Sequence, residues 1–202
     1  MIDRQQPRWT AFGLILVAGM AIGGLTSFGQ TWLPFELSPL ANSSGSWVAL
    51  AFGLCLSNRS PRRGGVLGVL ALASMLAGYV IVADLRGFPS AASTVLFWTV
   101  AAVIAGPVLG IGAAWAHGAD DRKLGLAFSP LLGVLSGEGI YGLRALADTT
   151  PTVYWVCQIA VAFGLALVIG VVKLSTARSV AYMVGGSAIV AALMTMAIAV
   201  VS

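Results

Sequence analysis

Residues 64–83 read GGVLGVLALASMLAGYVIVA, twenty consecutive residues without a charged side chain. Arg62 and Arg63 precede this stretch and Asp84 follows it. Twenty helical residues extend about 30 Å, which is the thickness of the hydrocarbon core of a bilayer. Hydrocarbon offers peptide groups no hydrogen-bond partner, and the stretch lacks the alternating pattern of a barrel strand. It therefore predicts a membrane-spanning helix.

Similar apolar stretches follow one another along the chain. We expect an all-α fold, a polytopic transmembrane bundle of about seven spans, with six as the alternative count. The expected spans are residues 9–29, 40–57, 64–83, 91–116, 124–143, 152–172 and 180–201. At about twenty residues each, they use most of the 202 residues. Residues 1–202 are therefore expected to form a single integral membrane domain.

The overall composition also indicates a membrane protein. Charged residues make up 9% of the chain and hydrophobic residues 58%, and the mean hydropathy is +0.94. Soluble domains carry about 25% charged residues, so this class is excluded. The formal net charge is +4, but the basic residues lie at expected membrane edges, without the clusters and interleaved aromatic residues of a nucleic-acid face. The expected partner is the lipid bilayer, and no nucleic acid is expected.

The basic residues also predict an orientation. If the N-terminus is cytoplasmic, the outer side holds only Arg86 and Arg144. The inner side then holds nine of the eleven Lys and Arg residues: Arg4, Arg8, Arg59, Arg62, Arg63, Arg122, Lys123, Lys173 and Arg178. The positive-inside rule favours this arrangement. We expect a multi-pass protein of a bacterial inner (plasma) membrane, with its N-terminus in the cytoplasm and its C-terminus outside.

The second span is the least regular. Residues 30–46 form a long loop with two prolines and Glu36 but no basic residue. Counted from Trp47 to Ser57, the span that follows is too short to cross a bilayer alone. Two interpretations stay open: a helix that begins at about Leu40, or a broken helix that enters the bundle here.

Small residues spaced four apart predict where helices contact one another, because they let two backbones approach closely. Five such pairs occur in the expected spans: Gly19/Gly23, Gly64/Gly68, Gly106/Gly110, Gly133/Gly137 and Ala188/Ala192.

Glu138 is the most informative polar residue, because it lies about fourteen residues into its expected span. A carboxylate costs about 2.5–3.5 kcal/mol at the centre of a bilayer and less near its edge, so it should face the bundle or a water-filled cavity. Tyr141 follows three residues later on the same helix face. Two roles stay open for Glu138: an acid that contacts a ligand or a proton, or a salt bridge to Arg144 or Arg86.

The predicted topology brings further polar side chains to the same outer level. Gln30 and Gln158 each lie at the end of a span, where an amide offers a polar ligand both donors and an acceptor. The candidate ligand-binding residues are Glu138, Tyr141, Gln30, Glu36, Asn42, Arg86 and Gln158.

No residue pattern indicates an enzyme. His117, Asp120 and Asp121 superficially resemble a metal cluster, but a single His beside carboxylates in a turn is typical of a solvated helix cap. The chain has one His, which excludes His-rich zinc sites, and it contains no P-loop, Rossmann fingerprint or GxSxG motif. We expect no catalytic residue, no metal site and no cofactor.

Two segments carry a resemblance to a known family: residues 41–47 (ANSSGSW) and residues 105–110 (AGPVLG). Together with its length, they make the chain resemble an uncharacterised family of small polytopic actinobacterial membrane proteins, for which no activity is implied. In shape, the chain is similar to the S-components of energy-coupling factor transporters. Those proteins bind micronutrients in an outward-facing pocket capped by the loop after their first helix. Residues 30–46 and Glu138 match those places, which implies a small-molecule ligand and a transporter scaffold subunit as partner.

Two functions therefore stay open. The first is binding or transport of a small polar molecule through an outward-facing pocket near Glu138, in which case Glu138→Gln abolishes binding without unfolding the protein. The second is a non-catalytic structural or partner-assembly role, for example as a homo-oligomer. In that case Glu138→Gln is silent, and bulky residues at Gly106 or Gly133 disrupt association.

Overall fold

The computed structural model describes residues 8–201, and all the regular structure in this range is helical. Six helical segments are long and apolar enough to cross a membrane: Thr10–Trp32, Pro61–Leu85, Ala92–Trp115, Asp121–Ala145, Thr152–Val172 and Ala177–Ala197. The all-α, polytopic architecture predicted from the apolar stretches is therefore confirmed, and the chain is a multi-pass membrane protein.

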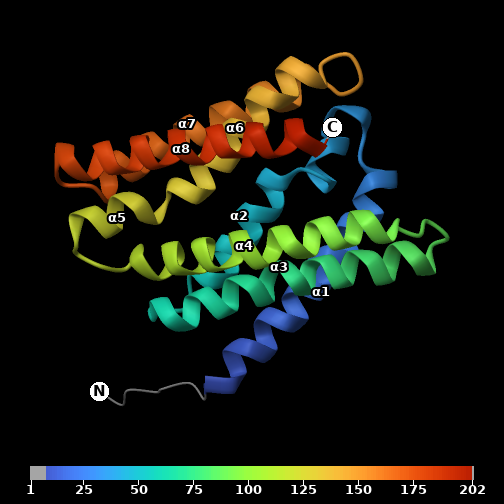
Figure 1. Cartoon of the computed structure of the whole chain (residues 1–202), viewed down its shortest axis with the longest axis horizontal. Coiled ribbons are helices and arrows are strands. Elements are labelled where there is room, and N and C mark those ends of the chain that lie inside the picture. The colour runs from blue at the N-terminus through green and yellow to red at the C-terminus, as the bar shows by residue number, and fades with distance from the viewer. Residues whose placement is uncertain (1–7, 202) are drawn as a thin grey trace.

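The elements follow one another as α1 (Arg8–Trp32), η1 (Phe35–Ala41), α2 (Ser44–Cys55), α3 (Pro61–Leu85), α4 (Ala92–Trp115), α5 (Asp121–Ala127), α6 (Ser129–Ala145), α7 (Thr152–Val172) and α8 (Ala177–Val201). Here η1 is a 3-10 helix. The start of α1 and the end of α8 lie at opposite ends of the bundle (Figure 1). Following the predicted orientation, we call the end where α1, α3 and α8 finish the outer end.

The second expected span is a short, broken helix. Residues 40–57 were expected to span the membrane, but α2 covers only 12 residues, which is about 18 Å. The η1 segment precedes it, and α2 lies among the longer helices (Figure 1). The interpretation of a continuous helix from Leu40 is therefore wrong. The structure has six long spans, and α2 is the segment that returns the chain between α1 and α3.

The fifth expected span, residues 124–143, is one segment with a break in it. α5 ends at Ala127, and α6 begins at Ser129 with Pro130 in its first turn. Proline has no backbone N–H, so the ladder of helical hydrogen bonds is interrupted at this point. In the most apolar window of Asp121–Ala145, 72% of the residues are buried, the highest share among the six candidate spans. This segment is therefore the central element of the bundle.

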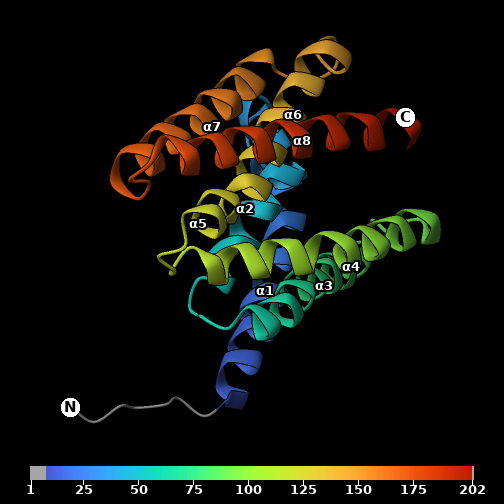
Figure 2. The same ribbon diagram turned by 60° about the vertical axis from the view of Figure 1, so that its left-hand side comes forward.

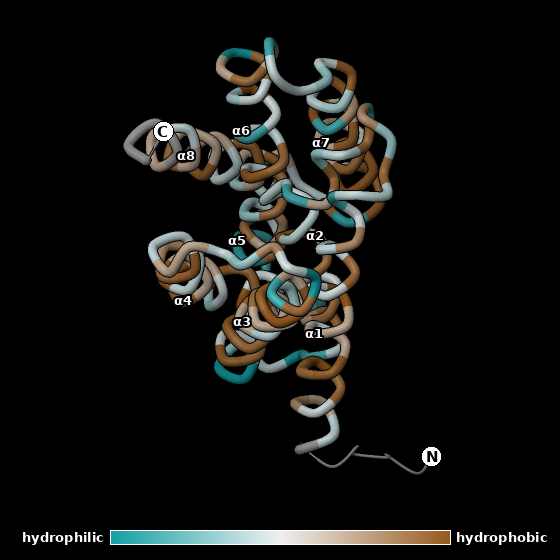
Figure 3. The backbone as a smooth tube through the Cα atoms, turned by 90° about the vertical axis from the view of Figure 1, so that its right-hand side faces the viewer, coloured by the Kyte–Doolittle hydropathy of each residue, from teal (hydrophilic) through white to brown (hydrophobic). Residues whose placement is uncertain are grey.

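The long helices form two groups. In one group α3 packs between α1 and α4, and in the other α6 packs between α7 and α8. α2 contacts α3, α4 and α6, and α5 contacts α4 and α8, so both short helices connect the groups (Figure 2). Most turns of the helices consist of hydrophobic residues, and hydrophilic residues are more frequent toward the connecting segments (Figure 3).

Glycines line the closest helix crossings. A Cβ atom on any of the four glycines between α3 and α4 would overlap backbone atoms of the opposite helix; these are Gly64, Gly68, Gly106 and Gly110. The predicted pair on α1, Gly19/Gly23, meets α3, and the pair on α6, Gly133/Gly137, meets α8. Ala188 and Ala192 are exposed. Four of the five predicted pairs therefore lie at contacts within the chain, so Gly106 and Gly133 are not free for association between chains.

Replacing Gly68 with alanine is expected to lower the thermal unfolding temperature of the purified protein. The added methyl group would overlap Gly106 O, and neither backbone can move without separating α3 from α4. Overpacking of this kind costs about 1–3 kcal/mol. Gly164→Ala is the matched control, because nothing lies within 4 Å of its Cβ position. Equal unfolding temperatures for both variants would contradict the close crossing.

Candidate functional site

Glu138 lies on α6, seven residues before its end at Ala145, and hence about 11 Å below the outer end of the helix. Its exposed fraction is 8%. Within the part of the chain that the structure describes, the one ion pair joins Lys123 and Asp120. Glu138 therefore forms no salt bridge with Arg86 or Arg144, and another set of groups must stabilise its carboxylate.

Four hydrogen-bond donors surround the carboxylate of Glu138. The backbone N–H of Ser44 donates to Oε1 at 2.7 Å. The backbone N–H of Gly45 donates to Oε2 at 2.7 Å, and the Ser43 hydroxyl donates to the same oxygen at 2.5 Å. The side-chain amide of Gln158, on α7, donates to Oε2 at 2.9 Å. Both oxygen atoms therefore accept hydrogen bonds from the start of α2, and Oε2 also accepts one from α7.

These bonds join the carboxylate to the N-terminus of α2. The first N–H groups of a helix have no partner within the helix, and the helix dipole places partial positive charge there. Ser43 is the N-cap residue, and its hydroxyl accepts the Gly45 N–H at 3.2 Å. Ser43 and Gly45 are buried and Ser44 is half-buried, so this helix end has little access to water. Glu138 supplies the missing acceptors, and the α2 N-terminus supplies the donors that a buried carboxylate needs.

Gly45 and Gln158 fix the geometry of this contact. A Cβ atom on Gly45 would lie 2.8 Å from Nε2 of Gln158 and 3.1 Å from Oε2 of Glu138. Only glycine lets the backbone come this close. Gln158 is 6% exposed and also donates to the carbonyl of Leu135 at 3.1 Å. Its amide nitrogen therefore faces α6. The carboxylate of Glu138 is thus held by α2 and by Gln158 of α7, and we call this arrangement the Glu138 cap.

Arg86, another predicted ligand-binding residue, joins α3 to α1 instead. Its guanidinium donates to the carbonyl and hydroxyl oxygens of Ser27 and, at 2.6 Å, to the Thr31 hydroxyl. It also lies over the Phe28 ring, 4.4 Å from the ring centroid. A cation near the last carbonyls of a helix is favourable. Arg86 therefore stabilises the outer end of the α1–α3 pair.

The other predicted residues are not brought together around Glu138. Gln30 is exposed and accepts a hydrogen bond from the Tyr79 hydroxyl at 3.2 Å. Glu36 is exposed on η1, and Tyr141 is half-buried on α6. Asn42 is exposed at the end of η1 and lines a cavity. The structure thus brings Glu138 and Gln158 together. Asn42 instead lines the cavity, and Gln30 is bonded to Tyr79, another residue of the cavity lining.

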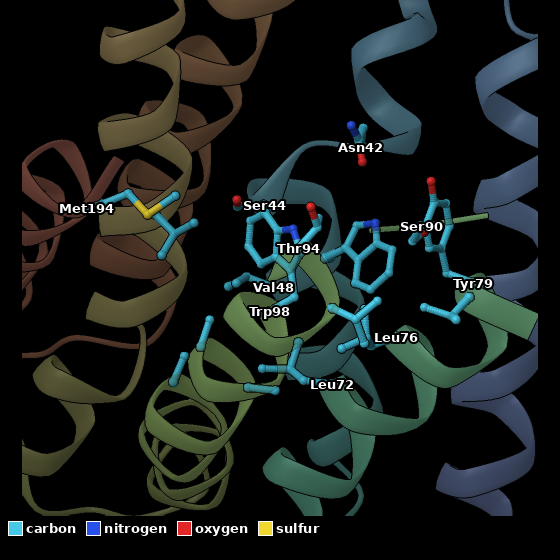
Figure 4. A pocket seen from close by; sticks show the side chains of 17 residues that line it. Asn42, Ser44, Val48, Leu72, Leu76, Tyr79, Ser90, Thr94, Trp98 and Met194 are labelled. Atoms are coloured by element: carbon cyan, nitrogen blue, oxygen red, sulfur yellow. The ribbon is translucent and has the colours of Figure 1, made fainter. Parts of the chain in front are cut away.

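This cavity has a volume of about 290 Å³ and lies in the outer half of the bundle. Side chains of α2, α3 and α4 form most of its lining: Asn42, Ser44, Trp47, Val48, Leu72, Leu76, Tyr79, Val80, Ser90, Thr94, Val95, Trp98, Ala101, Ala102, Ala105, Val134 and Met194. Figure 4 shows Asn42 and the Tyr79 hydroxyl at one end and Leu72 at the other. The lining contains no charged residue.

The Glu138 cap and the cavity share the first turns of α2. Ser44, Trp47 and Val48 line the cavity, and Ser44 is also the residue whose N–H binds Glu138. The Trp47 and Tyr79 rings meet edge to face with centroids 6.0 Å apart. Glu138 does not line the cavity. It is therefore a positioning residue, because it fixes the helix that forms one wall.

Sequence reasoning missed Ser43, Ser44 and Gly45 as partners of Glu138. A signal for them is present in the sequence: serine is one of the preferred N-cap residues, and Ser43 and Ser44 lie shortly before an apolar stretch. The aromatic residues that line the cavity, Trp47, Tyr79 and Trp98, come from three separate helices. No local pattern predicts that they meet.

The polar turn at the inner end forms helix caps. Asp120 accepts the backbone N–H of Lys123 at 2.9 Å as the N-cap of α5, and this bond lowers the pKa of the Asp120 carboxyl. His117 Nε2 lies 2.7 Å from the carbonyl of Leu56, and Asp121 accepts a hydrogen bond from Thr176. Among the described residues, no three His, Cys, Asp or Glu side chains form a group that could hold a metal ion.

Glu138→Gln is expected to destabilise the protein. Whichever way the new amide is turned, its NH2 group faces at least one N–H donor of α2 or Gln158, so one oxygen acceptor is lost. Losing a buried hydrogen bond to a charged group costs about 2 kcal/mol or more. The measurement is thermal unfolding in detergent, with the exposed Glu36→Gln as control. An unchanged unfolding temperature for Glu138→Gln would refute its capping role.

Two glycines of α2 provide a second test of the cap. Gly45→Ala is expected to lower the unfolding temperature, because its methyl group would be forced against Gln158 and Glu138. Gly53→Ala is expected to be neutral or slightly stabilising, because nothing lies within 4 Å of its Cβ position and alanine is the better helix former by about 1 kcal/mol. If both variants behave alike, the approach of Gly45 to the carboxylate is not tight.

Comparison with known proteins identifies a family. The sequence model of DUF6518, a family of unknown function, matches residues 2–202. No curated protein and no solved structure matches the chain. These comparisons therefore give no support to the similarity in shape to transporter S-components.

Proposed function

We propose that this chain, which belongs to the DUF6518 family of unknown function, is a non-catalytic membrane protein that binds a small molecule in the outer cavity. One observation carries the proposal: a cavity of about 290 Å³ lined mainly by apolar and aromatic side chains, with a few polar groups gathered at one end. Ligand sites in proteins are usually concave, mostly apolar and supplied with a few placed polar groups.

The lining indicates the chemistry of the ligand. Because no charged residue lines the cavity, a charged ligand would lose its hydration without gaining an ion pair. The Trp47, Tyr79 and Trp98 rings offer faces and edges to a flat molecule. Asn42, Ser90 and Thr94 offer hydrogen bonds. We therefore expect an uncharged, mainly apolar ring compound with one or two hydrogen-bonding groups, rather than a polar ligand held by Glu138.

The half-length α2 supports a role in binding or transport. Many transporters place substrate sites beside interrupted helices whose N-termini point at an anionic group. Here that anionic group is the carboxylate of Glu138, which belongs to the protein itself. The helix that it holds supplies Ser44, Trp47 and Val48 to the cavity.

Thermal unfolding with indole, menadione, thymine and nicotinamide tests the proposal. At least one compound is expected to raise the unfolding temperature, because a ligand at a hundredfold excess over Kd stabilises the folded state by about 2.7 kcal/mol. Ala101→Phe should abolish the effect by filling the cavity. Val103→Phe, on the same helix but exposed and outside the lining, should retain it.

Two results would contradict this proposal. Stabilisation that survives Ala101→Phe would place the binding elsewhere. If no compound stabilises the protein, the partner-assembly role becomes the better account, and the protein would then be expected to copurify with a transporter scaffold subunit or with a second copy of itself.

A further inference from the structure

A second cavity lies at the inner end of the bundle. Its volume is about 220 Å³, and its lining comes from the turns between α2 and α3 and between α4 and α5: Arg59, Pro61, Ala114, Trp115, His117, Gly118 and Lys123. It shares no residue with the outer cavity and lies near the opposite end of α4. An inference about it therefore stands independently of the proposed function.

The cavity has an excess of positive charge. Arg59 and Lys123 line it, and Arg62 and Arg63 begin the adjoining helix. Over residues 8–201, the side chains of Arg59, Arg62 and Arg63 form no hydrogen bond or ion pair. Of the two neighbouring acids, Asp120 accepts the backbone N–H of Lys123 and lies 3.8 Å from its Nζ, and Asp121 accepts a hydrogen bond from the Thr176 hydroxyl.

The helix that starts at this cavity adds donors. Pro61 is the first residue of α3, and Ser60 at the N-cap makes no side-chain capping bond. The side-chain amide of Asn58 donates to the Ser60 carbonyl, so it offers the helix no acceptor. The first N–H groups of the 25-residue α3 are therefore uncapped. Such a helix end attracts anions, and phosphate groups in particular.

Apart from His117, the remaining lining is mainly apolar. Trp115, Ala114 and Pro61 complete the wall of the cavity, and α4 exposes much of its surface to the surroundings of the bundle. Tryptophan is enriched at the level of lipid headgroups. Basic pockets between helices at the cytoplasmic face of membrane proteins bind anionic headgroups. The cavity thus combines cationic groups with an apolar wall at the edge of the membrane.

We propose that this inner cavity binds a phosphate group, with Arg59 and Lys123 as its cationic ligands, and that this phosphate belongs to an anionic phospholipid. The uncapped start of α3 contributes backbone donors and partial positive charge. Trp115 contacts the start of the acyl chains. His117 forms part of the wall, and its Nε2 stays with the carbonyl of Leu56. The bound lipid would hold together the two turns that join α2 to α3 and α4 to α5.

The test measures lipid binding to the detergent-purified protein by native mass spectrometry and by thermal unfolding. The probes are dioleoylphosphatidylglycerol, dioleoylphosphatidylcholine and inorganic phosphate. Phosphatidylglycerol is expected to bind and to raise the unfolding temperature, whereas phosphatidylcholine does neither. The double variant Arg59→Gln, Lys123→Gln should weaken phosphatidylglycerol binding at least about tenfold, since each basic residue near a membrane surface contributes about 1 kcal/mol.

Lys173→Gln with Arg178→Gln is the matched control. It removes the same number of positive charges at the same end of the bundle, but neither residue lines the cavity. This control should bind phosphatidylglycerol like the unaltered protein. If the double variant unfolds, the single variant Arg59→Gln is compared with the control instead, because the Arg59 side chain is exposed and its replacement should not disturb folding.

Three results would overturn the proposal. Equal weakening in the test and control variants would show general attraction to charged lipid. Equal binding of phosphatidylglycerol and phosphatidylcholine would show that the cavity does not select lipids with a net negative charge. No binding of phosphatidylglycerol or of inorganic phosphate would show that the cavity takes no phosphate at all. Stabilisation by inorganic phosphate alone, lost with Arg59→Gln and Lys123→Gln, would support the phosphate site but replace the lipid by a soluble phosphate compound.

Discussion

The structure depends on one buried interaction, between the carboxylate of Glu138 and the N-terminus of α2. A helix that begins within a membrane bundle exposes unpaired N–H groups where no water can satisfy them. A buried carboxylate has the opposite need, since it requires donors. Ser43, Ser44 and Gly45 meet Glu138 at distances of 2.5–2.7 Å, so each partner satisfies the other. Glu138 thus adds a polar anchor to the apolar packing of Val48, Ala51, Phe52 and Cys55, which also holds this 12-residue helix between the two groups of long helices.

The outer cavity follows from this arrangement. Because α2 starts below the outer ends of the long helices, α3 and α4 have a short helix rather than a full-length one beside them in the outer half. Trp47 and Val48 form one wall of the space that remains, and the side chains of α3 and α4 form the others. Arg86 holds α1 against α3, and the glycines between α3 and α4 hold that pair at close range. Together with the bonds of Glu138 to α2, these contacts hold the three helices that form most of the cavity lining.

Much of the fold could be predicted from the sequence, because the bilayer dictates long apolar helices and glycine spacing marks where they cross. Gly64, Gly68, Gly106 and Gly110 were predicted to lie at helix contacts and do so, but only the structure shows that the two pairs meet each other. The depth of Glu138 was also predictable, but its partner was not, because the N-cap of α2 lies 95 residues away in the chain. Both segments that carry the family resemblance lie at contacts between helices. Residues 41–47 form the cap, and residues 105–110 pack on α3.

A double-mutant cycle between Ser43→Ala and Glu138→Gln tests the central claim most directly, using reversible unfolding in mixed micelles with sodium dodecyl sulfate. Residues that share a buried hydrogen-bond network show coupling energies of about 0.5–3 kcal/mol, whereas independent residues show additive effects. We expect Ser43→Ala to be destabilising alone and to have little further effect once Glu138 is replaced. Strict additivity of the two free-energy changes would contradict the account, because it would mean that α2 is not held by Glu138.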